Sequence, residues 1–275
     1  TFDLIEKEIK KLSSEISFIK MFHNPDASFP NGIPNPILKE NWAPTRNKIL
    51  ETQADLGIAF DGDFDRCFFF DEKGDFIPGE IIVGMLADNF LEKDNKSKIV
   101  YEPRVIWNIL DIIEKHKGEG IVSKTGHAFI KVEMRKNNAV YGGELSAHHY
   151  FRDFAYCDSG MIPWILVVQS LMSDTRPFST IVNSRKKLFP TSGELNFKVL
   201  NPEKIIEKVF SSFSKDKNFS DFKDGLSMTF NNWRFNLRSS NTEPLLRLNI
   251  ESKGNDELIE RKIIELTNLI KKSNV

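Results

Sequence analysis

The chain has few cysteines, no excess of charge of either sign and no long apolar run. Its two thiols, Cys67 and Cys157, lie in unrelated contexts. They indicate buried thiols in a reducing compartment such as the cytoplasm, because a disulfide framework needs more cysteines. The 38 basic and 39 acidic side chains leave a net charge of −1, whereas nucleic-acid binders normally carry a basic excess. The longest apolar run, 161–168, is far shorter than the ~20 residues that cross a bilayer. We therefore expect neither nucleic acid nor membrane as a partner.

The overall composition is that of a globular protein. Hydrophobic residues make up 40% of the 275 residues and charged residues 28%, which excludes disordered and fibrous classes. The length predicts two or three domains. The chain begins inside an amphipathic helical pattern, with Phe2, Ile5 and Ile9 at helical spacing. We read this start as that of a fragment of a longer protein.

Two kinds of secondary-structure pattern divide the chain. After an expected strand at 16–21, short strands alternate with helices up to about residue 173; these strands are expected at 56–60, 67–70, 98–101, 120–123 and 139–142. In the last ~100 residues, strands follow one another, at 225–230, 233–237 and 245–251, with helices at 202–213 and 256–271. The pattern predicts layered mixed-sheet α/β domains followed by a C-terminal α+β domain with an antiparallel sheet.

Three carboxylates at alternate positions, Asp61, Asp63 and Asp65, lie between two apolar strands. They favour a site for Mg²⁺ or Ca²⁺, since hard cations take oxygen ligands. One alternative is an EF-hand, because Glu72 stands at that motif's twelfth position, although Arg66 takes the place of its glycine. The other is a solvated acidic turn. The neighbouring Arg66 suggests an anionic group, most simply a phosphate, bridged between metal and guanidinium.

A second polar segment follows two later strands. It comprises Lys124-Thr125-Gly126-His127 and the run 142–149, Gly-Gly-Glu-Leu-Ser-Ala-His-His. On an extended stretch, Glu144 and Ser146 face the same way and suit sugar hydroxyls. The alternative is a polar loop with a capping serine. His127 alone is consistent with the start of a helix, and His149 is expected only to pack.

A third segment, 238–244, joins two strands and reads Arg-Ser-Ser-Asn-Thr-Glu-Pro. A guanidinium, hydroxyls, an amide and exposed backbone N–H groups fit a phosphate. The alternative is a plain turn rich in Ser, Asn and Pro.

In this order, the three segments resemble the α-D-phosphohexomutase family. The metal loop is Asp-Gly-Asp-x-Asp-Arg, the sugar loop Gly-Glu-x-Ser-x-His, and the phosphate loop Arg-x-Ser-Asn-Thr-Glu-Pro. Finer features resemble the bacterial phosphomannomutase branch that supplies GDP-mannose synthesis: Phe64 in the metal loop, the run 146–153, and Trp233-Arg234-Phe235-Asn236-Leu237. The resemblance extends over the whole chain.

The resemblance implies a four-domain parent whose first domain carries a phosphorylated serine, the phosphoryl donor. That domain is absent from the sequence given. The chain would supply part of domain two (1–70), domain three with the sugar loop (71–173) and domain four with the phosphate loop (174–275).

The activity implied is interconversion of mannose 6-phosphate and mannose 1-phosphate through a 1,6-bisphosphate, with Mg²⁺ and with glucose or mannose 1,6-bisphosphate as activator or intermediate. Mg²⁺ would be held by Asp61, Asp63 and Asp65, and the transferring group would be stabilised by Arg66. The family's other basic catalytic residues match Arg104, His127 and His148, and the substrate-binding residues match Lys124, Glu144, Ser146, Arg238, Ser240, Asn241 and Thr242.

Two alternatives stay open at the level of sequence. Mannose and glucose share their 3- and 4-hydroxyls, so a phosphoglucomutase or a dual-specificity mutase is also consistent with the motifs. The chain could also be a non-catalytic remnant that binds sugar phosphate or metal.

Overall fold

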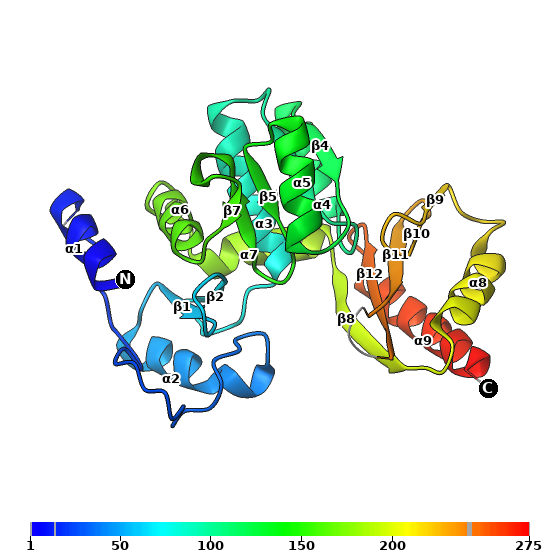
Figure 1. The fold of residues 1–275 in the computed structure, drawn as a ribbon, viewed down its shortest axis with the longest axis horizontal. Helices are drawn as coiled ribbons and strands as arrows, with labels where there is room; N and C mark the ends of the chain where they lie inside the picture. Colours follow the sequence, from blue (N-terminus) through cyan, green and yellow to red (C-terminus); the bar gives the residue numbers. More distant parts are fainter. Residues whose placement is uncertain (1, 14, 241–243, 275) are drawn as a thin grey trace. The chain divides into compact units, whose positions relative to one another are not determined.

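The computed structural model describes residues 2–13, 15–240 and 244–274, and divides the chain into two compact units, 1–34 and 35–275 (Figure 1). The first unit contains helix α1 (Phe2–Leu12). The strand expected at 16–21 is wrong, because the segment is irregular and has no strand partner in the described part. It packs on α1 through side chains instead: Lys20 Nζ lies 2.7 Å from Asp3 and 2.6 Å from Glu6.

The second unit opens with 3-10 helix η1 (Lys39–Asn41), helix α2 (Ala43–Thr52) and an antiparallel hairpin of β1 (Leu56–Phe60) and β2 (Cys67–Asp71). Strand β2 is buried throughout. In the described structure β1 pairs with β2 alone, and its Ile58 and Phe60 are half-buried. The metal loop, 61–66, is the connection of this hairpin.

A mixed five-stranded sheet follows, in the order β4-β3-β5-β6-β7. Its strands are β3 (Lys98–Tyr101), β4 (Glu119–Val122), β5 (Tyr141–Gly143), β6 (His149–Phe151) and β7 (Cys157–Asp158). The first three strands are parallel and the last two antiparallel. The carboxyl ends of parallel strands meet at one edge, where open α/β sheets place ligands. Residues 102–104, 123–127 and 144–148 follow those ends.

The helices of this part are α3 (Gly79–Lys93), α4 (Trp107–His116), α5 (His127–Asn137), α6 (Met161–Met172) and α7 (Phe178–Leu188). Helix α5 packs on β3 and β5 through a core of Val100, Ile130, Met134, Ala139 and Tyr150. A short 3-10 helix, η2 (Arg152–Phe154), joins β6 to β7. No helix in the described ranges is both long and apolar enough to cross a membrane.

The C-terminal sheet is antiparallel throughout, in the order β8-β12-β11-β10-β9. Its strands are β8 (Thr191–Lys198), β9 (Phe219–Asp221), β10 (Leu226–Thr229), β11 (Trp233–Ser239) and β12 (Leu245–Ser252). Helices α8 (Pro202–Phe213) and α9 (Asp256–Ser273) share one hydrophobic core with these strands. The predicted fold class, mixed α/β domains followed by an antiparallel α+β domain, is confirmed.

Candidate functional site

The metal loop gathers the three aspartates as its spacing predicts. Asp61, Asp63 and Asp65 each offer a carboxylate oxygen, and the three oxygens lie within 4.8 Å of one another. The chain turns between them because Phe64 takes a left-handed conformation, with φ of 64°. Its ring stacks on Phe60 at 5.1 Å between centroids. The cluster has the donor type and spacing that Mg²⁺ or Ca²⁺ requires.

Arg66 neutralises part of this cluster. Its backbone N–H donates to Asp61 Oδ1 (3.1 Å) and its Nε donates to Asp61 Oδ2 (2.6 Å). Asp65 Oδ1 is buried and lacks a hydrogen-bond partner within the described residues. Burial raises the pKa of Asp65, and the nearby charges of Asp61 and Asp63 raise it further. A cation between the carboxylates would relieve this repulsion, so the residues fit a metal.

The EF-hand alternative is wrong. The carboxylate of Glu72 does not turn to the aspartate cluster; it accepts hydrogen bonds from the N–H (3.0 Å) and hydroxyl of Ser179 in the first turn of α7. The loop is also flanked by two paired strands, whereas an EF-hand loop lies between helices.

The sugar loop meets the metal loop directly. Arg66 and His148 form an isolated antiparallel β-bridge. His148 Nε2 lies 3.5 Å from Asp65 Oδ2, and His148 Nδ1 lies 3.7 Å from Glu144 Oε2. The hydroxyl of Ser146 lies 3.2 Å from His148 Nδ1. Segments about eighty residues apart in the sequence therefore form one polar site.

The sugar loop is a tight turn, and the expectation of an extended stretch at 144–146 is wrong. The N–H of Ala147 donates to Glu144 O (3.1 Å), and Ala147 takes a left-handed φ of 68°. Glu144 is buried, where its carboxylate accepts hydrogen bonds from the N–H of Gly126 (2.7 Å) and the hydroxyl of Tyr150. Burial raises the pKa of Glu144. Ser146 is half-buried and turns to His148 instead.

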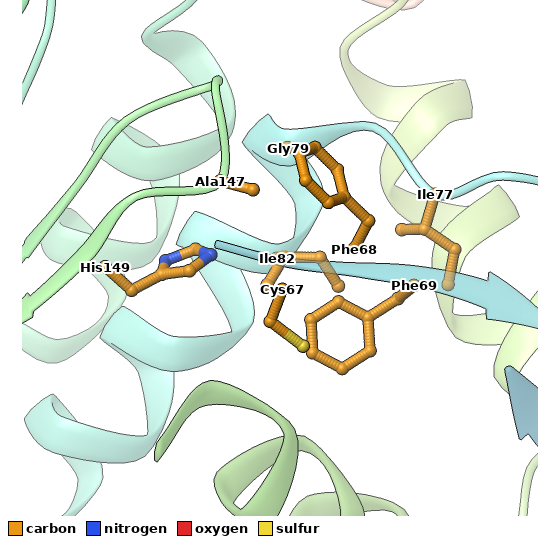
Figure 2. Close-up of a pocket in the computed structure, with 8 residues that line it drawn as sticks. All are labelled: Cys67, Phe68, Phe69, Ile77, Gly79, Ile82, Ala147 and His149. Carbon is orange, nitrogen blue, oxygen red and sulfur yellow. The ribbon is translucent and has the colours of Figure 1, made fainter. Parts of the chain in front are cut away.

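His149 points into the protein, as expected. Figure 2 shows its ring beside a small cavity lined by Cys67, Phe68, Phe69, Ile77, Gly79, Ile82 and Ala147. Its Nδ1 lies 2.8 Å from the hydroxyl of Tyr141. Burial lowers the pKa of His149 to about 3, so it stays neutral and serves packing.

The first residue of α3, Gly79, lies beside the sugar loop, near Ala147 (Figure 2). A Cβ on Gly79 would lie 2.2 Å from Leu145 O. We expect Gly79→Ala to destabilise the chain by about 1–3 kcal/mol and to weaken sugar-phosphate binding, because the backbone of the loop must move. Urea unfolding and calorimetric titration measure the two effects.

Gly84→Ala in the same helix is the matched control. Its Cβ would meet the side-chain ends of Asn108 and Ile112, not backbone. It should change stability without changing binding. Equal binding by both variants would show that Gly79 does not support the loop.

Sequence reasoning missed Glu102, the residue that follows β3. It is 1% exposed and accepts hydrogen bonds from the guanidinium of Arg104, the hydroxyl of Thr125 (2.7 Å) and the N–H of Leu145 (2.7 Å). Burial alone would raise its pKa, but the charge and hydrogen bonds of Arg104 hold the pKa below its usual value. Glu102 thus ties together the loops after β3, β4 and β5. Its position at the end of a parallel strand was the available signal.

A second carboxylate, Glu194 of β8, connects this network to the phosphate loop. Its oxygens lie 3.3 Å from Arg104, 3.4 Å from Arg238 and 3.4 Å from Arg247. Burial lowers the pKa of Arg238, and the charge of Arg104 lowers it further. The hydroxyl of Ser240 accepts from Arg247 (3.4 Å). Arg104 and Arg238 are thereby held on one carboxylate.

The remaining predicted residues are less closely joined to the site. Lys124 is exposed on the loop after β4, and His127 is exposed as the first residue of α5. Lys124 Nζ lies 5.8 Å from the ring centroid of Phe129. Within the described ranges, no hydrogen bond or ion pair joins either one to the metal loop. Asn241 and Thr242 lie outside the described residues.

Three family models match the chain in succession. They describe the alpha/beta/alpha domain II of phosphoglucomutase/phosphomannomutase (residues 2–74), its alpha/beta/alpha domain III (78–189) and its C-terminal domain (194–265). The matches are in the order of the domains along the chain, and together they leave few residues unassigned.

Curated relatives agree with these models. The chain is 53% identical over 274 residues to a phosphomannomutase of Vibrio cholerae, covering 99% of this chain and 59% of the relative. It is 53% identical over 268 residues to a phosphomannomutase of Escherichia coli, covering 98% and 59%. The chain therefore spans about three fifths of the length of these relatives.

Solved structures share the fold. A phosphoglucomutase/phosphomannomutase family protein of Burkholderia thailandensis has a TM-score of 0.82 at 26% identity, covering 93% of this chain and 55% of that one. An N-acetylphosphoglucosamine mutase of Aspergillus fumigatus, in complex with GlcNAc-6P and magnesium, has a TM-score of 0.56 at 13% identity, covering 79% and 49%.

Proposed function

The chain belongs to the phosphoglucomutase/phosphomannomutase family, and on that premise we propose that it forms the metal-, sugar- and phosphate-binding part of an enzyme that interconverts mannose 6-phosphate and mannose 1-phosphate. The observation that carries the proposal is the bridge between Arg66 and His148, which brings the metal loop and the sugar loop into one site. The identity of 53% to phosphomannomutases supports mannose as the sugar.

The metal in this proposal is Mg²⁺, which the Aspergillus fumigatus structure holds with its sugar phosphate. Asp61, Asp63 and Asp65 would bind it, and its charge would neutralise the phosphoryl oxygens. Arg66, anchored on Asp61, would stabilise the transferring phosphoryl group. We expect its guanidinium to do so by positioning and charge, the two contributions on which phosphoryl transfer mainly depends.

The substrate would lie between the sugar and phosphate loops. Glu144 and Ser146 would bind its 3- and 4-hydroxyls, with Lys124 nearby. Arg238, Ser240, Asn241 and Thr242 would hold the phosphate that is not transferred. A donor phosphoserine would pass its phosphoryl group to the free hydroxyl. The bond from serine oxygen to phosphorus breaks and a bond from sugar oxygen to phosphorus forms. The hydroxyl proton passes to a basic residue of the site, and the released serine oxygen takes up a proton.

The basic residues of this step would be Arg104, His127 and His148. The product of this step from a mannose phosphate is mannose 1,6-bisphosphate, which returns its other phosphate to the serine after turning in the site; glucose 1,6-bisphosphate would act as an activator. We assign 1–70, 71–173 and 174–275 to domains two, three and four, and the donor serine to a first domain outside the chain. We propose a cytoplasmic location, which the two free thiols and the hexose phosphate substrates support.

A coupled assay on the full-length gene product tests the function. We expect Mg²⁺-dependent conversion of mannose 1-phosphate to mannose 6-phosphate. Glucose 1-phosphate is the comparison substrate, because a site that reads the 3- and 4-hydroxyls discriminates weakly between the two sugars. Faster turnover of glucose 1-phosphate would favour a phosphoglucomutase. Turnover of neither sugar phosphate would favour the alternative of a non-catalytic protein that binds sugar phosphate or metal.

Removing one carboxylate tests the metal assignment. Asp63→Asn deletes a charge and a strong ligand from the cluster. We expect Mg²⁺ affinity to fall on the order of tenfold or more, because the site loses one negative charge and one hard oxygen ligand. Calorimetric titration of the full-length protein measures it, with Asp153→Asn, an exposed aspartate of η2, as control. Equal affinities for Asp63→Asn and the parent would refute the assignment.

A further inference from the structure

A buried ion pair of the C-terminal sheet is not explained by the site described so far. Arg234 of β11 and Glu251 of β12 lie opposite each other in register and are 1% and 0% exposed. Arg234 Nη1 donates to Glu251 Oε1 at 2.6 Å. Moving two charges out of water costs free energy that their mutual attraction often does not recover. A buried ion pair in a sheet core therefore calls for a further role.

Both side chains reach out of their sheet to one backbone segment. Arg234 Nη2 donates to Pro103 O (2.8 Å), and its Nη1 donates to Arg104 O (3.1 Å). The carboxylate of Glu251 accepts the N–H of Ile106 (2.7 Å) and of Trp107 (2.9 Å). Two carbonyls and two amides within residues 103–107 are therefore fixed from the C-terminal sheet.

The charges match the backbone groups that they meet. Trp107 begins α4, so Glu251 supplies a negative charge to the N–H groups at a helix N-terminus, where no side chain of the helix caps them. Arg234 supplies a positive charge to two carbonyl oxygens just before it. Neither role can be exchanged for the other, and each side chain neutralises its partner.

We propose that Arg234 and Glu251 form a clamp that positions Arg104. The clamp holds the backbone on both sides of the Arg104 Cα. The guanidinium is therefore positioned against Glu102 and Glu194, between the sugar and phosphate loops. Among the residues that the structure describes, no hydrogen bond or ion pair joins Arg234 or Glu251 to a ligand-binding side chain of either loop, so they are positioning residues. That Arg104 acts on a sugar phosphate rests on the proposed function, whereas the clamp itself rests on the contacts of 103–107.

The experiment replaces the pair by apolar residues of similar size. Arg234→Met/Glu251→Leu leaves no unpaired buried charge, a replacement that proteins often tolerate without loss of stability. We expect the amides of Ile106 and Trp107 to exchange hydrogen at least about tenfold faster, because each loses a charged acceptor. Binding of glucose 1,6-bisphosphate with Mg²⁺, measured by calorimetry, should weaken at least about fivefold.

A thermodynamic cycle with Arg104→Gln shows whether the clamp acts through Arg104. If it does, the clamp replacement weakens binding in the parent but adds little in the Arg104→Gln background. Equal weakening in both backgrounds, or unchanged exchange at 106 and 107, would overturn the proposal. Where the double replacement does not fold, Glu251→Gln serves in the same comparisons.

Arg185→Gln is the matched control. Arg185 also donates to a backbone carbonyl at α4, that of Asn108 (3.1 Å), and pairs with Asp111 (2.8 Å), but it does not contact 103–104. It should alter neither the exchange of Ile106 nor binding of the bisphosphate. If the parent chain binds no bisphosphate, the proposed function fails at that point, and the exchange measurement alone then supports or overturns the clamp.

Discussion

In a coupled assay, the 275-residue chain alone is expected to convert no measurable mannose 1-phosphate, even with added sugar 1,6-bisphosphate and Mg²⁺. The models that match it are those of domains II, III and the C-terminal domain. The family resemblance places the donor serine in the first domain. A mutase without its phosphoryl donor cannot carry out the catalysed reaction. We therefore expect its rate to fall on the order of 10⁶-fold or more.

We expect that the serines within the site do not replace that donor. Ser146 lies against His148 Nδ1 (3.2 Å), and Ser240 accepts from Arg247 (3.4 Å) in the phosphate loop. Both are assigned to ligand binding. The Vibrio cholerae phosphomannomutase in the same assay is the positive control, and Mg²⁺ titration shows that the chain is folded. Turnover comparable with that control would place the donor within these residues.

Much of the fold was predictable because local signals and tertiary structure agree. The helix expected at 202–213 is α8 to the residue: Pro202 stands in its first turn, and Asn201 caps it by accepting the N–H of Lys204 (3.0 Å). At the start of α6 the hydroxyl of Ser159 accepts the N–H of Met161 (3.1 Å), so a serine next to an apolar run again marks the beginning of a helix.

The failures have a common cause. The stretch 16–21 carries a strand-like pattern, but a strand also needs a partner, and its side chains instead pair with α1. The strands β6, β7 and β9 were missed because they have two or three residues and acquire their structure from pairing. Period and propensity do not report such pairing.

The site shows the same division. The three loops were found because their polar residues cluster in sequence, whereas Glu102, Glu194 and Glu251 are isolated carboxylates whose partners are distant. The turn of the sugar loop was missed because it depends on a left-handed backbone conformation at Ala147. Alanine rarely adopts that conformation. The role of such a single carboxylate can be inferred only when the fold shows which distant groups it contacts.

Arg238→Lys is expected to lower kcat/KM of the full-length enzyme by about 10- to 100-fold, the loss of one charge-assisted hydrogen bond or more. Arg238 is 7% exposed, its Nη2 lies 3.4 Å from Glu194, and its Nε has no hydrogen-bond partner within the described residues. A planar fork anchored at one end presents its remaining donors in fixed directions, which lysine cannot reproduce.

The loss should fall on both halves of the reaction, because the phosphate loop would hold whichever phosphate is not being transferred. The measurement is steady-state kinetics in the direction from mannose 1-phosphate, and again from mannose 6-phosphate. Arg135→Lys, at an exposed position of α5 outside the site, is the control and should leave both values unchanged. If Arg238→Lys also leaves them unchanged, the segment 238–244 is only a turn, and the phosphate is bound elsewhere.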